Sequence, residues 1–226
     1  MKNIKLYLVL ILLYLAHIQC VAQVDLQKLD NKKNYKQWIL PTTLVLYGST
    51  ISKTQGLPND LDVQAYRNNH FPTFKTKIDD YAVFGPVAIA GIAKISGLKS
   101  ESTYTGMALK YAGAMLLSNV VIQPMKHSFK RLRPDNTSTT SFPSGHTTLA
   151  FVGAEMVHQE FHNPWLSVSA YTLATSVATM RILNNRHWYS DVIVGAGIGI
   201  LSTKVAYWAY HKYAEKKKKK SLKLVF

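Results

Sequence analysis

The stretch FPSGHTTLAFVGAEMVHQEF, residues 142–161, joins a turn-forming segment directly to an apolar segment. Pro143 and Ser144 suit the start of a helix, and Gly145 lets the backbone come close to a ligand. Free backbone amides at a helix start point toward an anion, so this turn has the features of a phosphate-binding cradle. The stretch therefore predicts a helix over Thr147 to Phe161 with an anion site at its beginning.

Four further segments of similar composition lie on both sides of this helix along the chain. All are rich in Ala, Gly and branched apolar residues, and short polar joints separate them. No useful strand-like alternation appears except near the C-terminus. The sequence thus predicts an all-α fold, built as a helical bundle. The four segments are Tyr81 to Leu98, Thr105 to Met125, Trp165 to Arg181 and Ser190 to His211.

The lengths of these helical segments, 15 to 22 residues, lie on the boundary between buried helices and helices that span a bilayer. We expect a membrane-embedded bundle with five or six transmembrane helices. The alternative is a soluble bundle, because the segments contain charged residues and the mean hydropathy of the chain is only -0.02. The charged residues include Lys94, Lys110, Glu155 and Lys204.

The N-terminus has the features of a secretory signal. Lys2 and Lys5 precede the apolar run Leu6 to Leu15, and small residues follow. Residues 1–22 are therefore expected to be a signal peptide or an uncleaved N-terminal anchor. Cys20 is the only cysteine, so the exported chain has neither a disulfide framework nor a thiolate metal site.

The rest of the chain is expected to form one domain with a flanking segment at each end, since 226 residues suffice for one substantial core. Residues 23–80 are expected to be a polar periplasmic or interfacial segment. Within it the apolar run Trp38 to Ser52 contains Pro41 and is short for a span, so we expect it to be interfacial or packed. Residues 81–213 form the helical domain that carries the motifs, and residues 214–226 form a basic tail.

The charge of the chain favours anionic partners. Lys and Arg total 27 against 12 Asp and Glu, which gives a formal charge of +15. Such an excess suits nucleic acid, anionic lipid or a phosphorylated substrate, and charge alone does not choose among them. The C-terminal run Lys216 to Lys220 is expected to lie against an anionic membrane surface, where each lysine contributes about 1 kcal/mol.

Two further clusters combine residue types that suit phosphate chemistry. Lys126 and Arg133 are nearly two helical turns apart, so both can project from one side if the preceding helix continues. His187 and Asp191 are four positions apart, so on a helix the carboxylate can reach one imidazole nitrogen and leave the other free to attack. Arg181 precedes this pair near the end of a helix. A basic run or a helix-surface contact would explain each cluster alone, but their conjunction favours catalysis.

Read in order, three motifs resemble the signature of the type 2 phosphatidic acid phosphatase (PAP2) superfamily. They are KHSFKRLRP at residues 126–134, PSGH at residues 143–146 and RILNNRHWYSD at residues 181–191. The motifs span less than a third of the chain, but their order and internal spacing fit. One departure is Met180, where the family usually has a serine that can lend a phosphate contact. This puts affinity rather than chemistry in doubt.

The resemblance implies a covalent mechanism that needs no metal or other cofactor. His187 attacks phosphorus, Asp191 stabilises the imidazolium, and His146 protonates the departing oxygen before water hydrolyses the phosphohistidine. Fixed cations and amides hold the phosphoryl oxygens and stabilise the charge of the transition state. These phosphate-binding residues are Lys126, Arg133, Ser144, Gly145 and Arg181.

A count of membrane crossings provides an independent check. If the N-terminal segment directs residue 23 outside, the helices bring all three motifs to one face, and the last helix delivers Lys216 to Lys220 to the cytoplasm, as the positive-inside rule requires. A crossing by Trp38 to Ser52 would invert every side and leave these lysines outside. We therefore expect a protein of the bacterial inner membrane with its active site facing the periplasm.

The resemblance favours hydrolysis of a phosphate monoester or pyrophosphate on a membrane lipid. Lipid A, undecaprenyl pyrophosphate and phosphatidylglycerophosphate are the candidates, with a slight preference for lipid A. One alternative is a soluble periplasmic non-specific acid phosphatase of the same superfamily; vanadium haloperoxidases share the motifs but resemble this chain less in length. The non-enzymatic alternative is a basic protein that binds anionic lipid or nucleic acid, which predicts binding that survives loss of His187. Nucleic acid is not expected as a partner of the enzyme.

Overall fold

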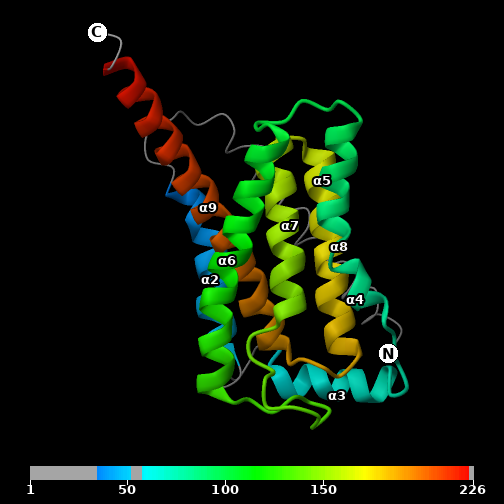
Figure 1. Ribbon diagram of the computed structural model, residues 1–226. Coiled ribbons are helices and arrows are strands. Elements are labelled where there is room, and N and C mark those ends of the chain that lie inside the picture. The colour runs from blue at the N-terminus through cyan, green and yellow to red at the C-terminus, as the bar shows by residue number, and fades with distance from the viewer. Residues whose placement is uncertain (1–34, 52–57, 224–226) are drawn as a thin grey trace.

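The computed structural model describes residues 35–51 and 58–223, and these residues form helices joined by turns and loops (Figure 1). The predicted signal segment, residues 1–22, lies outside the described residues. Within the described part of the chain the all-α prediction is confirmed. The helices are α2 (Lys36–Thr50), α3 (Asp60–His70), α4 (Ile78–Ala82), α5 (Gly85–Ile95), α6 (Tyr104–Phe129), α7 (Gly145–Phe161), α8 (Pro164–Leu183) and α9 (Tyr189–Lys223).

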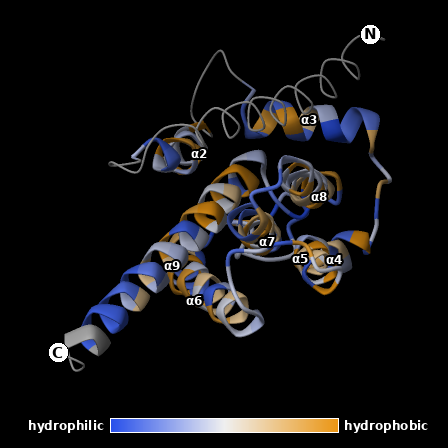
Figure 2. Cartoon of the chain, turned by 90° about the horizontal axis from the view of Figure 1, so that it is seen from above, coloured by the Kyte–Doolittle hydropathy of each residue, from blue (hydrophilic) through white to orange (hydrophobic). Residues whose placement is uncertain are grey.

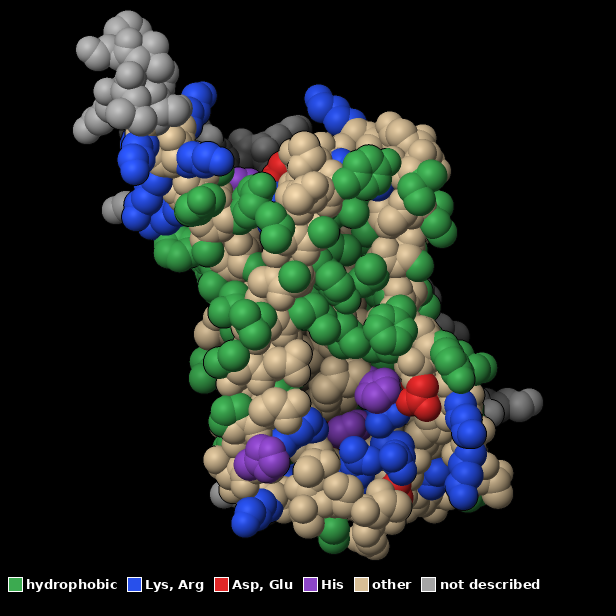
Figure 3. All heavy atoms as spheres, viewed as in Figure 1, with side chains coloured by type: hydrophobic (Ala, Val, Ile, Leu, Met, Phe, Trp, Pro, Cys, Tyr) green, Lys and Arg blue, Asp and Glu red, His purple; other side chains and the backbone are tan. Residues whose placement is uncertain are grey.

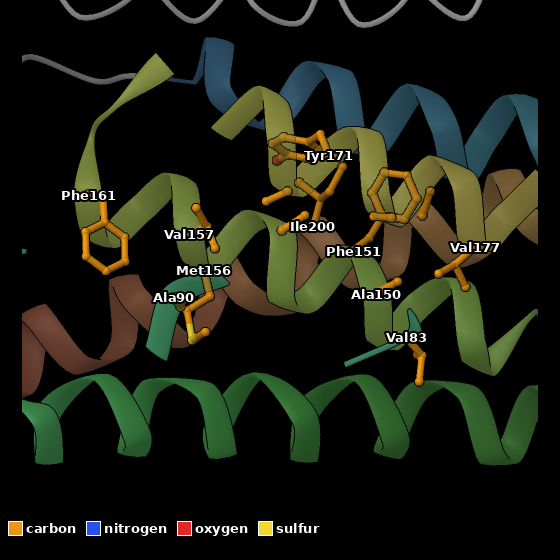
Figure 4. Close-up of a cluster of buried hydrophobic side chains, with 14 of the residues drawn as sticks. Val83, Ala90, Ala150, Phe151, Met156, Val157, Phe161, Tyr171, Val177 and Ile200 are labelled. Carbon is orange, nitrogen blue, oxygen red and sulfur yellow. The ribbon is translucent and has the colours of Figure 1, made fainter. Parts of the chain in front are cut away.

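Helix α7 occupies the centre of the bundle. Helices α5, α6, α8 and α9 all pack against it, and the view from above shows it among them (Figure 2). Its side chains from Ala150 to Val157 are buried on every side, as expected for a helix that is apolar all round. They form the main core with residues such as Tyr171 of α8 and Ile200 of α9 (Figure 4).

Glycines in α9 let the neighbouring helices approach closely. Gly195 and Gly199 face α7, and a Cβ at Gly199 would lie 2.5 Å from the carbonyl oxygen of Thr148. Gly197 faces α2, where a Cβ would lie 2.8 Å from the carbonyl oxygen of Pro41. Because no side chain fits into these gaps, the glycines set the spacing of α2, α7 and α9.

The five predicted helices are present, with shifted ends. The segment predicted as Tyr81 to Leu98 forms the short helix α4 and the helix α5, and the last predicted helix continues as α9 through the lysine run. Helix α3 was not predicted, because its sequence is polar. Asn59 starts this helix through a capping box with Asp62.

Helix α2 packs along α9 in the antiparallel direction (Figure 1). Pro41 lies against Gly197, and Gly48, near the end of α2, lies against Val194, near the start of α9. The segment that begins at Trp38 was expected to be either interfacial or packed, and the structure shows it packed against the bundle. The bundle thus includes residues that precede the domain expected from residue 81.

Three of the charged residues that interrupt the apolar helices, Lys110, Glu155 and Lys204, are paired inside the bundle. Nζ of Lys110 lies 2.6 Å from Oε1 of Glu101 and 3.4 Å from Oε1 of Glu160. Nζ of Lys204 lies 2.7 Å from Oε1 of Glu155. Because each buried charge has a partner of opposite sign, these residues are compatible with a bundle in an apolar environment.

The outer surface of α6 is apolar over most of its length. Leu109, Leu116 and Val120 are each more than half exposed, and only 28% of the most apolar part of this 26-residue helix is buried. Among the described helices, α6 and residues 189–220 of α9 are long and apolar enough to cross a membrane. Figure 3 shows apolar side chains over the middle and upper part of this face, with Lys, Arg and His side chains gathered at the lower end.

Candidate active site

The three motifs meet at one end of the bundle (Figure 1). The first lies in the last turn of α6 and the loop after it, the second at the start of α7, and the third at the end of α8, in the following loop and at the start of α9. Figure 3 shows His side chains next to Lys and Arg side chains at this end. The fold therefore brings the motifs together, as the count of crossings predicted.

His187 lies in the loop between α8 and α9, and its side chain is 2% exposed. Its Nδ1 is 2.8 Å from the carbonyl oxygen of Ser141. Since a carbonyl oxygen only accepts hydrogen bonds, Nδ1 carries the proton and Nε2 keeps its lone pair. Burial lowers the pKa of His187 to about 4, with Arg181 and Lys126 adding to the effect and Asp191 opposing it. The imidazole is therefore neutral at pH 7, as a nucleophile requires.

Asp191 is fully buried in the first turn of α9. Its Oδ2 accepts hydrogen bonds from the hydroxyl of Ser141 and the backbone N–H of Trp188, and Arg131 donates to its Oδ1 at 2.9 Å. Nδ1 of His187 lies 3.5 Å from Oδ2, beyond the ordinary range of a hydrogen bond. The carboxylate therefore acts on the histidine through its charge and through Ser141, which binds both side chains.

Arg131 joins two buried carboxylates that are far apart in the chain. Besides Asp191, it contacts Asp60 at the start of α3, with Nη2 2.6 Å from Oδ2. Asp60 also accepts hydrogen bonds from the backbone N–H and the hydroxyl of Ser190, both at 2.8 Å. These contacts fasten α3 to the site and fix the start of α9.

Lys126, Arg133 and Arg181 supply positive charge to the site. Nζ of Lys126 donates to the carbonyl oxygen of Thr140 at 2.7 Å, and Nη1 of Arg181 donates to Asp79 at 2.6 Å. The Nε atoms of Arg133 and Arg181 are buried, and neither has a hydrogen-bond partner among the described residues. A buried donor without a partner costs about 1–3 kcal/mol, so two of them in a cationic site indicate an anionic ligand.

The start of α7 presents an open face beside a histidine. The hydroxyl of Ser144 accepts a hydrogen bond from the backbone N–H of Thr147 at 3.4 Å and so caps the helix. A Cβ at Gly145 would meet no atom within 4 Å, so the space beside this residue is open. His146 is 37% exposed, and its Nε2 lies 3.0 Å from Oδ1 of Asp80. This arrangement suits a phosphate cradle.

The motifs contain the predicted site residues, but they did not indicate the side chains that hold them. Arg131 lies within the first motif and Ser141 lies two residues before the second. This proximity was the only feature of the sequence that could have indicated their contacts with the site. Asp60, Asp79 and Asp80 lie far ahead of the motifs, in the segment expected to be polar and interfacial. In the part of the chain that the structure describes, no group of three or more His, Cys, Asp or Glu residues is placed to hold a metal ion.

The fold and the site define a helical-bundle protein with a neutral, buried histidine among cations. The PAP2 superfamily model matches residues 107–215. The lipid A 1-phosphatase of Porphyromonas gingivalis is 40% identical to this chain over 152 residues, which cover 66% of this chain and 34% of that protein. The chain thus spans about a third of the length of this curated relative.

Two solved structures share the fold. The crystal structure of Aquifex aeolicus LpxE matches with a TM-score of 0.50 and 20% identity, covering 67% of this chain and 96% of that chain. The first transmembrane PAP2 type phosphatidylglycerolphosphate phosphatase from Bacillus subtilis matches with a TM-score of 0.53 and 21% identity, covering 79% and 97%. At these identities the likeness shows the fold alone. The two sequence matches identify the chain as a member of the PAP2 superfamily.

Proposed function

We propose that this protein is a phosphatase that hydrolyses a phosphate monoester or pyrophosphate on a membrane lipid through a phosphohistidine intermediate. The observation that carries the proposal is the neutral His187 in a site where two buried guanidinium nitrogens, those of Arg133 and Arg181, lack partners among the described residues. The site thus contains an attacking nitrogen together with donors for phosphoryl oxygens. Membership of the PAP2 superfamily supports the same chemistry.

The mechanism has two steps. In the first, Nε2 of His187 forms a bond to phosphorus, the bond from phosphorus to the leaving oxygen breaks, and His146 gives its proton to that oxygen. Arg133 and Arg181 donate hydrogen bonds to the phosphoryl oxygens as negative charge develops there. In the second step, the neutral His146 takes a proton from water, the water oxygen attacks phosphorus, and phosphate leaves while Nε2 regains its lone pair.

We further propose that the bundle is embedded in a bacterial inner membrane, with five or six helices crossing it. Helix α6 supports this proposal because most of its apolar surface faces away from the core, which is unlike the core helix of a soluble bundle. Exposed apolar side chains also lie on α2 and α5. They include Ile39, Leu46, Ile92 and Ile95.

In this proposal the site faces the periplasm. The site and Lys216 to Lys220 lie at opposite ends of α9, so the positive-inside rule favours a cytoplasmic lysine run. Because α2 runs antiparallel to α9, Lys36 lies toward the end that carries the lysines. Lys36 is then cytoplasmic, and α2 crosses the membrane. This differs from the topology predicted from the sequence, in which residue 23 lay outside and the segment from Trp38 did not cross.

Cysteine labelling tests the sidedness. In a Cys20→Ser background, single cysteines at Ser138, Glu215 and Lys36 are exposed to a thiol reagent that enters the periplasm but does not cross the inner membrane. We expect labelling at Ser138 and none at the other two positions. Labelling at both Ser138 and Glu215 would contradict a membrane-embedded bundle and favour the soluble acid phosphatase.

Lipid A is the substrate that we favour, because the relative at 40% identity is a lipid A 1-phosphatase. The test is phosphate release in mixed micelles with EDTA, comparing lipid A, undecaprenyl pyrophosphate, phosphatidylglycerophosphate and the soluble ester p-nitrophenyl phosphate. We expect release from lipid A and a loss of about 10³-fold or more in His187→Ala. That variant should still bind vanadate, since the cations remain.

The other outcomes separate the alternatives. A preference for p-nitrophenyl phosphate over every lipid would favour the acid phosphatase. Activity of His187→Ala within tenfold of the native protein would overturn the nucleophile. Binding of anionic vesicles without release from any substrate would favour the non-enzymatic alternative.

A further inference from the structure

Two neighbouring aspartates of α4 contact residues of the site, although α4 lies outside the segment that matches the PAP2 model, which begins at residue 107. Asp79 is fully buried, and Asp80 is half exposed. Carboxylates near a phosphate site repel the ligand unless their charge is engaged by other groups. Both aspartates are engaged in this way, and by side chains to which the mechanism gives a direct role.

Asp79 holds Arg181. Its Oδ2 accepts a hydrogen bond from Nη1 of Arg181 at 2.6 Å, and its Oδ1 accepts one from Nδ2 of Asn184 at 2.9 Å. Asn184 also bonds the backbone N–H and carbonyl of Thr76, at 2.9 Å and 3.0 Å, and so fastens the segment before α4 to the end of α8. A guanidinium fixed at one nitrogen presents its remaining donors in a fixed direction. One of these donors is the buried Nε, which has no hydrogen-bond partner among the described residues.

Asp80 holds His146. Its Oδ1 lies 3.0 Å from Nε2 of His146 and 3.4 Å from Nη1 of Arg181. The carboxylate accepts the hydrogen of Nε2, and Nδ1 makes no hydrogen bond within the described residues, so Nδ1 is the nitrogen available to transfer a proton. Burial and the charge of Arg181 lower the pKa of His146, and the carboxylates of Asp80 and Asp79 oppose this effect. Asp80 therefore stabilises the protonated imidazolium, which is the form that can act as an acid.

We propose that Asp79 and Asp80 are positioning residues of the reaction. Asp79 fixes Arg181 for binding the phosphoryl group, and Asp80 fixes His146 and favours its protonated form for the leaving oxygen. This proposal rests on the proposed function, because it assigns roles within the same site. A merely structural role, in which the pair only fastens α4 to the bundle, predicts a loss of stability without a selective change in binding or pH dependence.

The test of Asp80 uses Asp80→Asn with Asp62→Asn as the matched control. Asp62→Asn removes one carboxylate from the exposed side of α3 and keeps an oxygen for the backbone N–H of Asn59. We expect Asp80→Asn to lower kcat by about 10- to 100-fold with KM within about threefold, because an amide does not stabilise the imidazolium. The alkaline limb of the pH profile should move to lower pH, and Asp80→Glu should recover part of the rate.

The test of Asp79 is vanadate binding to purified protein, which requires no lipid substrate. We expect Asp79→Asn to weaken vanadate binding by about tenfold or more, because Arg181 exchanges a bond to a charged carboxylate for a weaker bond to a neutral amide and is fixed less firmly. The pH dependence of vanadate binding by Asp80→Asn provides a second measurement of His146 without turnover. It should shift in the same direction as the alkaline limb.

Each outcome bears on one proposal. Asp80→Asn with the kcat and pH profile of Asp62→Asn would overturn the role of Asp80, and unchanged vanadate affinity in Asp79→Asn would overturn that of Asp79. A lower melting temperature with neither change would also overturn both roles. If the native protein releases no phosphate while the two variants alter vanadate binding as expected, the proposed function is wrong, and Asp79 and Asp80 position Arg181 and His146 for binding an anion rather than for the reaction.

Discussion

The acid limb of the pH–rate profile tests the environment of His187 most directly. In the proposed mechanism only the neutral imidazole attacks phosphorus, so protonation at low pH removes the nucleophile. Burial, with Arg181 and Lys126 nearby, lowers the pKa of His187 from 6.5 to about 4. A lowered pKa keeps the imidazole neutral to lower pH. The acid limb should therefore lie well below the range in which histidine ordinarily titrates.

The expected difference is large at pH 5. A histidine with a pKa of about 4 is about 90% neutral at this pH, whereas one with the ordinary pKa of about 6.5 is about 3% neutral. Between pH 7 and pH 5, His187 should thus lose only about a tenth of its reactive form, against about 25-fold for an ordinary histidine. The tenfold fall in kcat/KM per pH unit that marks the acid limb should begin only below about pH 4.

The assay is phosphate release at limiting substrate between about pH 3.5 and pH 8 at constant ionic strength. A phosphate monoester itself titrates near pH 6, so its protonation is measured by ³¹P NMR and divided out. Lys126→Met is the matched variant: it removes one cation near His187, raises the pKa of the imidazole and should move the acid limb to higher pH. A limb near pH 6.5 in the native protein would refute the reasoning.

Three further predictions follow from the packing and the charges of the bundle. Arg131→Met leaves Asp60 and Asp191 without their cation, although their side chains are only 4% and 0% exposed. The free energy of unfolding, measured by denaturation in detergent, should fall by about 3 kcal/mol. Adding Asp60→Asn to Arg131→Met should restore part of this loss. A change below about 1 kcal/mol in Arg131→Met would contradict the network. Gly199→Ala places a Cβ 2.5 Å from a backbone oxygen of α7 and should cost about 1–3 kcal/mol, whereas Gly91→Ala, with no atom within 4 Å of the Cβ, should be neutral or stabilising. EDTA should leave phosphate release unchanged, because Lys and Arg supply the positive charge; a loss that Mg²⁺ restores would point to a metal.

The sequence was sufficient to predict the apolar helices from residue 81 onward and to place the motif residues at one end of them. Long apolar segments bounded by polar joints have few alternatives to a helical bundle, and alternating crossings bring every second joint to the same end. Helix α3 was missed because its polar sequence carries no apolar periodicity, and its capping box depends on contacts of Asn59 with the two residues that follow Asp60. The packing of α2 along α9 was left open because its length, 15 residues, suits several positions.

The proposed chemistry of the site could be inferred from the sequence for a similar reason. Phosphoryl transfer needs a nucleophile, an acid and fixed cations, and the motifs contain His187, His146 and the basic residues in a recognisable order. The role of Asp191 was predicted from its spacing to His187. The structure adds that His187 precedes the helix and that its Nδ1 donates to the carbonyl of Ser141.

The sequence by itself therefore determined the class of fold and supplied the candidate site residues, because helical periodicity and the three motifs each depend on residues that are close together in the chain. Only the tertiary structure decided which groups hold those residues. Arg131, Arg181 and the protonated form of His146 are stabilised by partners of opposite charge, and any carboxylate that folding brings into contact can provide that charge. Asp60, Asp79 and Asp80 provide this charge from helices far ahead of the motifs. Their positions in the sequence therefore did not indicate that they contact the site.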